Sequence, residues 1–259
     1  MMKYDQIISL GGNCTVASNL RRRGLRRYSL PFDWTYITEQ RSLLYWCEGL
    51  ANGFKNLCLR ENINFEPLPP NDVHYGRLRV IDRYTGYVFV NHFNVTADFD
   101  SEYARVYAIL RRRVERLLSI LRGDGSCCLV IAPYSYVQID NSTLKLIHDS
   151  LANFNPKKVF HIVYMRFGSD AVNTSSEWLH IFNVIRKENI DDFNAVSSEW
   201  SWIDKYRLKD ESIFHFAYRQ TPFLRYRRQF SLMFFPQFTH FILIHIKKIT
   251  HKWKLPSQL

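Results

Sequence analysis

The sequence has few cysteines and lacks the short motifs that mark the most common enzyme sites. Its 259 residues contain five cysteines, none of them in C-x-x-C spacing. An odd number of cysteines without such pairs argues against a disulfide framework and against a structural zinc site. The patterns GxxxxGK[ST], GxGxxG, HExxH and GxSxG are also absent, so nucleotide-binding loops, zinc proteases and serine hydrolases receive no support. We therefore expect reduced thiols and no metal.

Acidic residues are missing from the last part of the chain. The formal net charge is +11, and after Ser212 no Asp or Glu occurs while eight Lys and Arg follow. Polar residues interrupt the apolar stretch 229–246, which disfavours a membrane span. We expect residues 211–259 to form a basic, aromatic C-terminal segment that lies on an anionic membrane surface. The alternative is that its Phe side chains pack on the rest of the protein.

A secretory signal is missing as well. The N-terminus, MMKYDQIISL, has no charged region followed by a long apolar stretch and a small-residue cleavage site. We therefore expect a cytoplasmic location, with peripheral attachment to the inner face of the membrane through the C-terminal segment.

What the sequence does contain is an alternation of apolar runs and helical patterns, with 46% hydrophobic residues in total. The patterns predict helices over 38–54, 101–122, 141–153 and 175–187, a surface loop over 61–72, a hairpin over 77–93, and strands over 126–134 and 158–165. Strands that alternate with helices are typical of a largely parallel sheet flanked by helices. We expect residues 1–210 to form one α/β catalytic domain.

The segment ISLGGNCTVASNLRRRGLRRYSLPFDW, residues 8–34, reads as a strand, a glycine turn and a helix. Asn13 is the predicted N-cap, which places Cys14 in the first helical turn, where free N–H groups and the helix dipole favour a thiolate. Gly11 and Gly12 let the backbone approach a ligand, and N–H groups from there to Thr15 can hold an oxyanion. The alternative is that Cys14 is a small buried residue.

A nucleophilic cysteine needs a base, and His92 is the best placed of the nine histidines because it ends a predicted strand. Asn94, Asp98 and Asp100 lie within reach of the same loop, and each is a candidate to orient the His92 ring. We assign this role to Asp100, although it directly precedes the helix 101–122 and has an alternative role as its N-cap. Asp33 and Trp34 are candidates for binding substrate, and Asp33 has an alternative role in the turn after Pro31. His92 can equally be a structural histidine.

The opening segment 8–34 resembles a bacterial family described as papain-like cysteine peptidases, which begins with a similar Ser-Leu-Gly-x-x-Cys turn and a Ser-x-Pro-Phe-Asp-Trp segment. NHFNVTADFDSEYARVYAILRRRVERLLSIL, residues 91–121, is similar to its His-Phe loop and Arg-rich helix. The resemblance covers about residues 5–190. It implies a Cys–His enzyme with Cys14 and His92 at the matched positions, and an α+β papain-like fold as the alternative architecture.

The same opening is similar to capsule-polysaccharide proteins that bind coenzyme A and are thought to be acetyltransferases. Three functions follow as hypotheses. The first is a cysteine enzyme that hydrolyses or transfers acyl groups, on a small molecule or cell-surface polysaccharide, without a required cofactor. The second is an O-acetyltransferase of polysaccharide biosynthesis that uses acetyl-CoA. The third is a non-catalytic module that holds an anionic glycan through the Arg-rich segments 21–27 and 111–116. No aromatic-interleaved RNA motif accompanies these segments, which disfavours nucleic acid.

Overall fold

The computed structural model describes residues 2–68, 70, 72, 76–95, 98–134, 136–167, 172–184 and 200–210. The chain divides into two units, Met1–Ser212 and Ile213–Leu259. The second unit lies outside the described residues, so the predicted C-terminal segment and its membrane contact stay predictions. No helix within the described ranges is long and apolar enough to cross a membrane.

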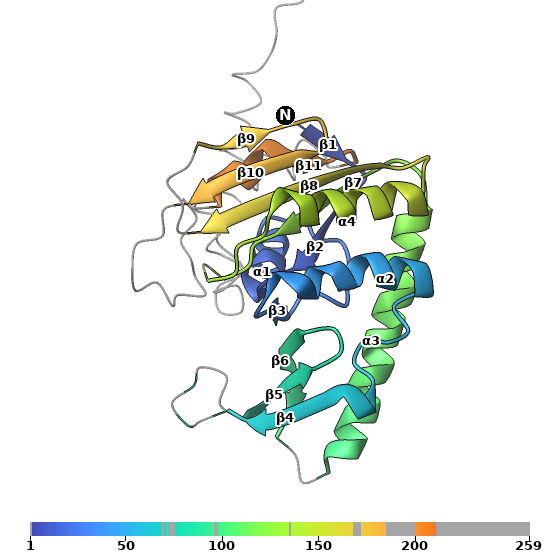
Figure 1. Cartoon of the computed structure of the whole chain (residues 1–259), viewed down its shortest axis with the longest axis vertical. Coiled ribbons are helices and arrows are strands. Elements are labelled where there is room, and N and C mark those ends of the chain that lie inside the picture. Colours follow the sequence, from blue (N-terminus) through green and yellow to red (C-terminus); the bar gives the residue numbers. More distant parts are fainter. Residues whose placement is uncertain are drawn as a thin grey trace, which may run out of the picture. The chain divides into compact units, whose positions relative to one another are not determined.

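The first layer is a five-stranded sheet in the order β2-β7-β8-β10-β9. Its strands are β2 (Gln6–Gly11), β7 (Ser126–Ile131), β8 (Val159–Phe167), β10 (Leu179–Val184) and β9 (Thr174–Ser175). All neighbouring pairs are parallel except β10 and β9. Helices α1 (Cys14–Arg22) and α4 (Asn141–Phe154) follow β2 and β7 directly along the chain (Figure 1). The mixed α/β class is thereby confirmed, while the papain-like alternative stays a prediction.

Side chains of β7 show why this sheet is buried on both faces. Cys127, Leu129 and Ile131 belong to the larger core, with residues of three further helices. Cys128 and Val130 belong to a second core on the opposite face, with Val16 and Leu20 of α1 and aromatic residues of the segment 200–208. Alternate residues of a strand point to opposite faces, so a continuous apolar run is what a strand covered on both sides requires.

The second layer is a four-stranded antiparallel sheet in the order β3-β6-β5-β4. It comprises β3 (Thr35–Ile37), β4 (Ile63–Pro67), β5 (Arg77–Asp82) and β6 (Tyr87–Asn94). The long helix α3 (Phe99–Arg122) runs beside both sheets (Figure 1), and its apolar face packs with Val80, Phe89 and Phe93 in the larger core. The helix predicted over 101–122 is confirmed, beginning two residues earlier.

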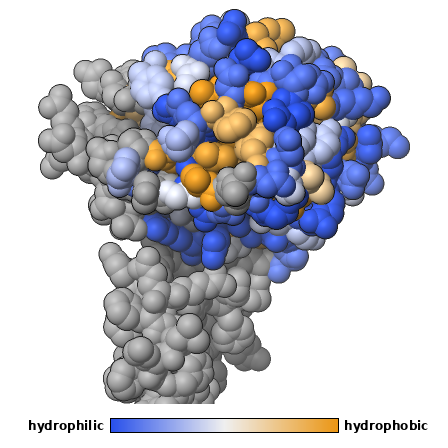
Figure 2. All heavy atoms as spheres, turned by 90° about the horizontal axis from the view of Figure 1, so that it is seen from below, coloured by the Kyte–Doolittle hydropathy of each residue, from blue (hydrophilic) through white to orange (hydrophobic). Residues whose placement is uncertain are grey.

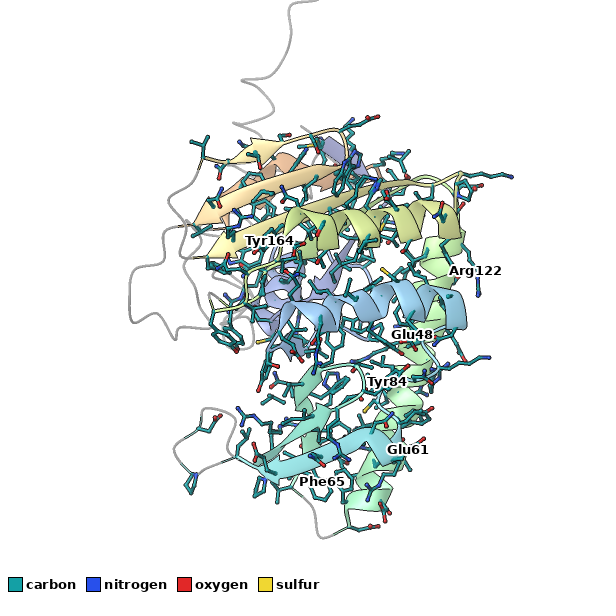
Figure 3. All side chains as sticks on the ribbon, viewed as in Figure 1. Glu48, Glu61, Phe65, Tyr84, Arg122 and Tyr164 are labelled. Carbon is teal, nitrogen blue, oxygen red and sulfur yellow. The ribbon has the colours of Figure 1, made fainter. Side chains whose placement is uncertain are left out.

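Helix α2 (Tyr45–Asn52) continues the short 3-10 helix η1 (Gln40–Leu44), which confirms the helix predicted over 38–54. The turn between β5 and β6 is tied to α2, because the Tyr84 hydroxyl donates to Glu48 over 2.8 Å, and the two side chains point toward each other in Figure 3. Inside this turn the buried Asp82 accepts backbone N–H groups of Tyr84 and Thr85. Side-chain acceptors of this kind fix the hairpin that the sequence predicts at Thr85-Gly86.

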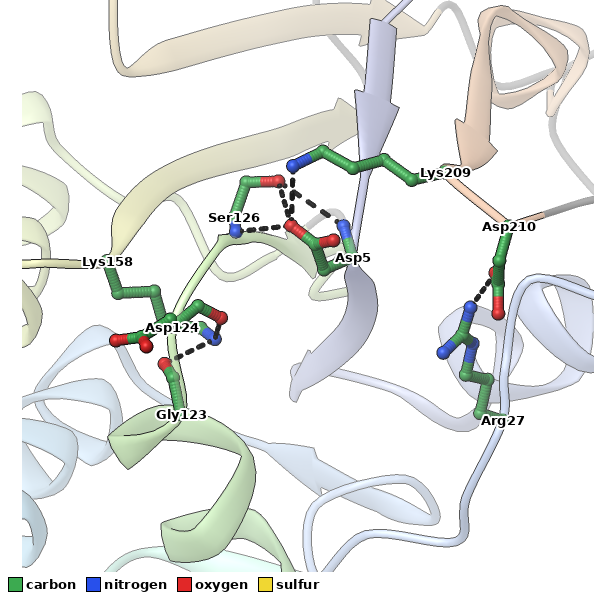
Figure 4. A network of polar contacts seen from close by, with 8 residues as sticks. All are labelled: Asp5, Arg27, Gly123, Asp124, Ser126, Lys158, Lys209 and Asp210. Carbon is green, nitrogen blue, oxygen red and sulfur yellow. Dashed lines mark hydrogen bonds and ion pairs between the residues drawn. The ribbon is translucent and has the colours of Figure 1, made fainter.

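The segment 200–210 joins the first layer through polar contacts as well as apolar packing. Strand β11 (Tyr206–Leu208) pairs in parallel with β1 (Met2–Tyr4). Lys209 donates to Asp5, which also accepts from the backbone and hydroxyl of Ser126. Arg27 pairs with Asp210 beside this network (Figure 4), and Arg23 pairs with Asp204. These contacts hold the segment against β1 and the residues around α1.

Two secondary-structure predictions are wrong. The stretch 61–72, predicted as a loop, contains the edge strand β4. The stretch 175–187, predicted as a helix, contains β9 and β10, so His180 lies on a strand. Short apolar runs fit either a buried strand or a helix by periodicity, and here pairing with β8 decides the outcome.

Candidate functional site

The turn between β2 and α1 is built by two glycines that adopt positive φ. Gly11 has φ +94° and Gly12 has φ +105°, a region that side chains disfavour. A Cβ on Gly12 would lie 3.0 Å from backbone atoms of Ala132 and Pro133, so this turn packs tightly against the end of β7. The Asn13 side chain accepts the Thr15 N–H over 2.7 Å and caps α1, which begins at Cys14 as predicted.

Cys14 lines a cavity of about 500 Å³ between the carboxyl ends of β2 and β7 and one face of the antiparallel sheet. Open α/β sheets commonly bind ligands at this edge. Viewed from below, the molecule shows an apolar patch within a polar rim (Figure 2). The other lining residues are Trp34, Thr35, Tyr36, Thr38, Leu68, Asp72, Arg79, Ile81, Val88, Val90, Asn91, Tyr134 and Tyr136. The site is thus a partly apolar cavity with aromatic rings, amide and hydroxyl groups.

Burial disfavours the charged thiolate form of Cys14. Its side chain is 7% exposed, and burial raises its pKa to about 12, although its own backbone N–H acts in the opposite direction. Burial in an apolar surrounding disfavours the charged thiolate more than one helix terminus favours it. Burial therefore opposes the activated thiolate that the position at the start of α1 favours.

His92 does not line the cavity of Cys14. Its ring lies edge-on to Phe89, and its Nε2 is 3.1 Å from a guanidinium nitrogen of Arg113 on α3. Burial and the nearby Arg113, Arg105 and Arg77 lower the pKa of His92 to about 3. Because a guanidinium only donates, Nε2 accepts and the ring proton is on Nδ1. This Nδ1 is buried and has no hydrogen-bond partner among the residues that the structure describes. The predicted pairing of His92 with Cys14 stays a prediction.

Asp33 and Trp34 lie on either side of the cavity wall. Trp34 lines the cavity, whereas Asp33 is fully buried behind it and accepts the Leu30 N–H and an Arg26 guanidinium N–H, both over 2.9 Å. Burial raises the pKa of Asp33, and Arg26 opposes this shift. The Arg26 guanidinium also lies 5.6 Å from the Trp34 ring centre. Asp33 therefore holds the turn that carries Trp34.

Asp100 is exposed to solvent and pairs with a residue other than His92. Its side chain pairs with Arg60 over 3.0 Å and is 78% exposed. The N-cap of α3 is Asp98, which accepts the Asp100 N–H, so the expectation that Asp100 is the cap is wrong by two residues. The structure brings Cys14 and Trp34 to one cavity, with Gly11, Gly12, Asn13 and Thr15 in the adjoining turn, and leaves His92, Asp33 and Asp100 outside it.

Several lining residues were not predicted from the sequence. Tyr134 and Tyr136 follow β7, at the sheet edge where Cys14 follows β2, and the strand prediction over 126–134 could have indicated them. Tyr36 lies edge-on to Tyr134 at 5.6 Å, and its hydroxyl accepts from Arg79 over 3.1 Å. Asn91 is the immediate neighbour of His92. No group of three or more His, Cys, Asp or Glu is placed to hold a metal ion in the described part of the chain.

Comparison with known proteins adds a family relationship. A family model described as "putative papain-like cysteine peptidase" matches residues 5–165, which include the Cys14 turn, the antiparallel sheet, α3, α4 and most of β8. No curated protein matches the chain, and no solved structure does.

Proposed function

This chain belongs to the papain-like cysteine peptidase family named above, and from that premise we propose that it is a cysteine-dependent enzyme that hydrolyses or transfers acyl groups with Cys14 as its nucleophile. The observation that carries the proposal is the position of Cys14. Of the five cysteines it alone lines the cavity, while Cys58, Cys127 and Cys128 are packed in the cores. A nucleophile must be reachable by a substrate, and the first turn of α1 meets that need.

The proposed reaction has two steps. The Cys14 sulfur attacks the acyl carbon, a C–S bond forms and the bond to the leaving group breaks. The thiol proton passes to the leaving oxygen or nitrogen, directly or through cavity water, so that no free thiolate accumulates. Water or an acceptor hydroxyl then attacks the thioester, releases the acyl product and returns a proton to the sulfur. This order suits a thiol whose pKa burial raises.

The Cys14 N–H is our candidate donor for the developing oxyanion. The Gly11 N–H already donates to the Ser9 hydroxyl, and the Thr15 N–H donates to Asn13. The Cys14 N–H stands beside its own sulfur at the start of α1. We assign the oxyanion to this N–H, which the helix dipole reinforces. Gly11 and Thr15 then shape the turn and do not bind the acyl oxygen.

The aromatic wall favours a coenzyme A-dependent acetyltransferase as a second candidate. Tyr134 and Tyr136 stack with ring centres 5.6 Å apart, and Trp34 and Tyr36 line the same cavity. Flat rings can pack against a sugar or the planar base of coenzyme A. Binding of acetyl-CoA in calorimetry, with acetyl appearing on a glycan acceptor, supports this candidate. Peptide hydrolysis without such binding supports the peptidase.

The test of the proposal uses p-nitrophenyl acetate, a neutral acyl ester. We expect a burst of about one p-nitrophenolate per protein, because Cys14 becomes acetylated before the thioester is hydrolysed. The burst should be absent in Cys14→Ser and present in the matched control Cys47→Ser, which changes a partly exposed cysteine outside the cavity. An equal burst from Cys14→Ser would overturn the proposal.

A further inference from the structure

The end of β6 contains an irregularity that decides which of its side chains enter the Cys14 cavity. Leu78 pairs with Phe93 and Val80 pairs with Phe89, so one residue of β5 between the pairs faces three residues of β6. A bulge of this kind re-aims side chains that strict alternation would send elsewhere. Val88 and Val90 line the cavity at alternate positions, and at the bulge Asn91 lines it as well.

Asn91 has the properties of a ligand-binding group. It is half-buried, and across the described ranges no hydrogen bond ties up its side-chain amide, although it faces the cavity that holds Cys14. An amide offers two N–H donors and one oxygen acceptor without carrying charge. Such a group can stabilise a developing oxyanion without having to lose or gain a proton.

His92, the next residue, is held on the other side of the strand. Its ring packs on Phe89, Arg113 donates to its Nε2, and its backbone carbonyl accepts from Arg105. All three partners belong to the core or to α3. The contacts pin the end of β6 to α3 and so fix the bulge that presents Asn91.

From this geometry we propose that Asn91, and not His92, is the residue of β6 that contacts the acyl substrate at Cys14, with its amide donating to the acyl oxygen. His92 is a positioning residue that acts through Arg113. The inference rests on the proposed function, because it assigns a donor to the same acyl transfer. It adds a side-chain donor from the same cavity to the Cys14 N–H.

The test measures acetylation of Cys14 by p-nitrophenyl acetate in single-turnover experiments. Asn91→Ala should lower the rate constant about a hundredfold, as loss of one oxyanion donor does in other enzymes. Asn91→Asp keeps the shape but lacks the donors and should lose at least as much. His92→Gln, whose oxygen can still accept from Arg113, should retain nearly the wild-type rate, while His92→Ala should fall between the two.

Replacing Asn91 by histidine gives a measurement, the alkylation rate of Cys14, that a purely structural role of Asn91 would not change. Asn91→His places an imidazole on the cavity side, so alkylation of Cys14 by iodoacetamide near neutral pH should become faster than in wild type. The matched control Val95→His introduces a histidine at an exposed position just beyond β6 and should leave the rate unchanged. Melting temperatures of all variants check that the fold persists.

The outcomes separate the two proposals. Wild-type protein that is not acetylated on Cys14 overturns the proposed function itself. Wild-type protein that is acetylated, with Asn91→Ala and Asn91→Asp at full rate and His92→Gln strongly impaired, overturns the inference and makes His92 the functional group. A hundredfold loss in both Asn91 variants with His92→Gln active supports it.

Discussion

The turn after β2 and the end of β6 each carry a candidate catalytic residue, and the fold places the two residues in different surroundings. Cys14 faces the cavity because it occupies the first position of α1, a place that the glycines and the Asn13 cap determine locally. His92 faces α3 because a bulge and two contacts with arginines of α3 turn it there. A helix cap fixes the direction of the neighbouring side chains through contacts within a few residues. The direction of side chains at a strand end depends instead on the segments that pair with the strand.

The largest effect that this comparison predicts is the loss of the nucleophile. Cys14→Ser should lower the rate of acyl-enzyme formation by roughly 10⁴-fold or more, as removal of a catalytic nucleophile does in hydrolases. The fold should persist because the substitution is nearly isosteric. Steady-state hydrolysis of p-nitrophenyl acetate and a thermal melt measure both effects. A fully active Cys14→Ser variant would mean that Cys14 and its turn have only a structural role.

The next effect concerns stability of the cavity wall. Arg26→Ala removes the cation that donates to the buried Asp33, so the free energy of unfolding should fall by about 3 kcal/mol. Arg41→Ala breaks the exposed pair with Glu39 and should cost about 1 kcal/mol or less. Urea unfolding measures both variants. Equal losses would show that the Asp33 ion pair is no more important than a surface pair.

The pH dependence of stability reports the state of His92. Its pKa is lowered from 6.5 to about 3 in the folded protein, so the unfolded chain binds more protons between these values. The contribution of His92 is therefore fully present above pH 6.5 and is lost as the pH falls toward 3, at up to about 1.4 kcal/mol per pH unit. His92→Gln should flatten the slope of unfolding free energy against pH between 6.5 and 4.5. An unchanged slope would mean that His92 is already charged in the folded state.

The smallest effect is expected for the cysteines away from the cavity. Single changes of Cys47, Cys58, Cys127 and Cys128 to Ala should leave the activity within about tenfold of wild type, since these residues only pack. The substitutions of the buried Cys58, Cys127 and Cys128 should lower the melting temperature, because each leaves a small cavity. Loss of activity without loss of stability in any of them would place a second functional thiol in the molecule.

The predictable parts of this protein are those set by neighbours in the chain. The β2 turn, the hairpin at Thr85-Gly86 and α3 follow from glycines, caps and apolar periodicity. The strand nature of 179–184 follows from pairing with β8, which lies more than ten residues earlier. The cavity side of Asn91 follows from a bulge against β5, and the buried state of Asp33 from Arg26. Pairings and ion pairs between segments have no local signal.

Peptide mapping by mass spectrometry after brief exposure to p-nitrophenyl acetate tests the central claim most directly. The protein is quenched in acid, digested, and searched for the acetyl group on all five cysteines and on the lysines. The account predicts one acetyl group per chain on Cys14, with the other four cysteines unmodified. Acetyl on another cysteine, or only on surface lysines, would contradict the assignment of Cys14 as the nucleophile.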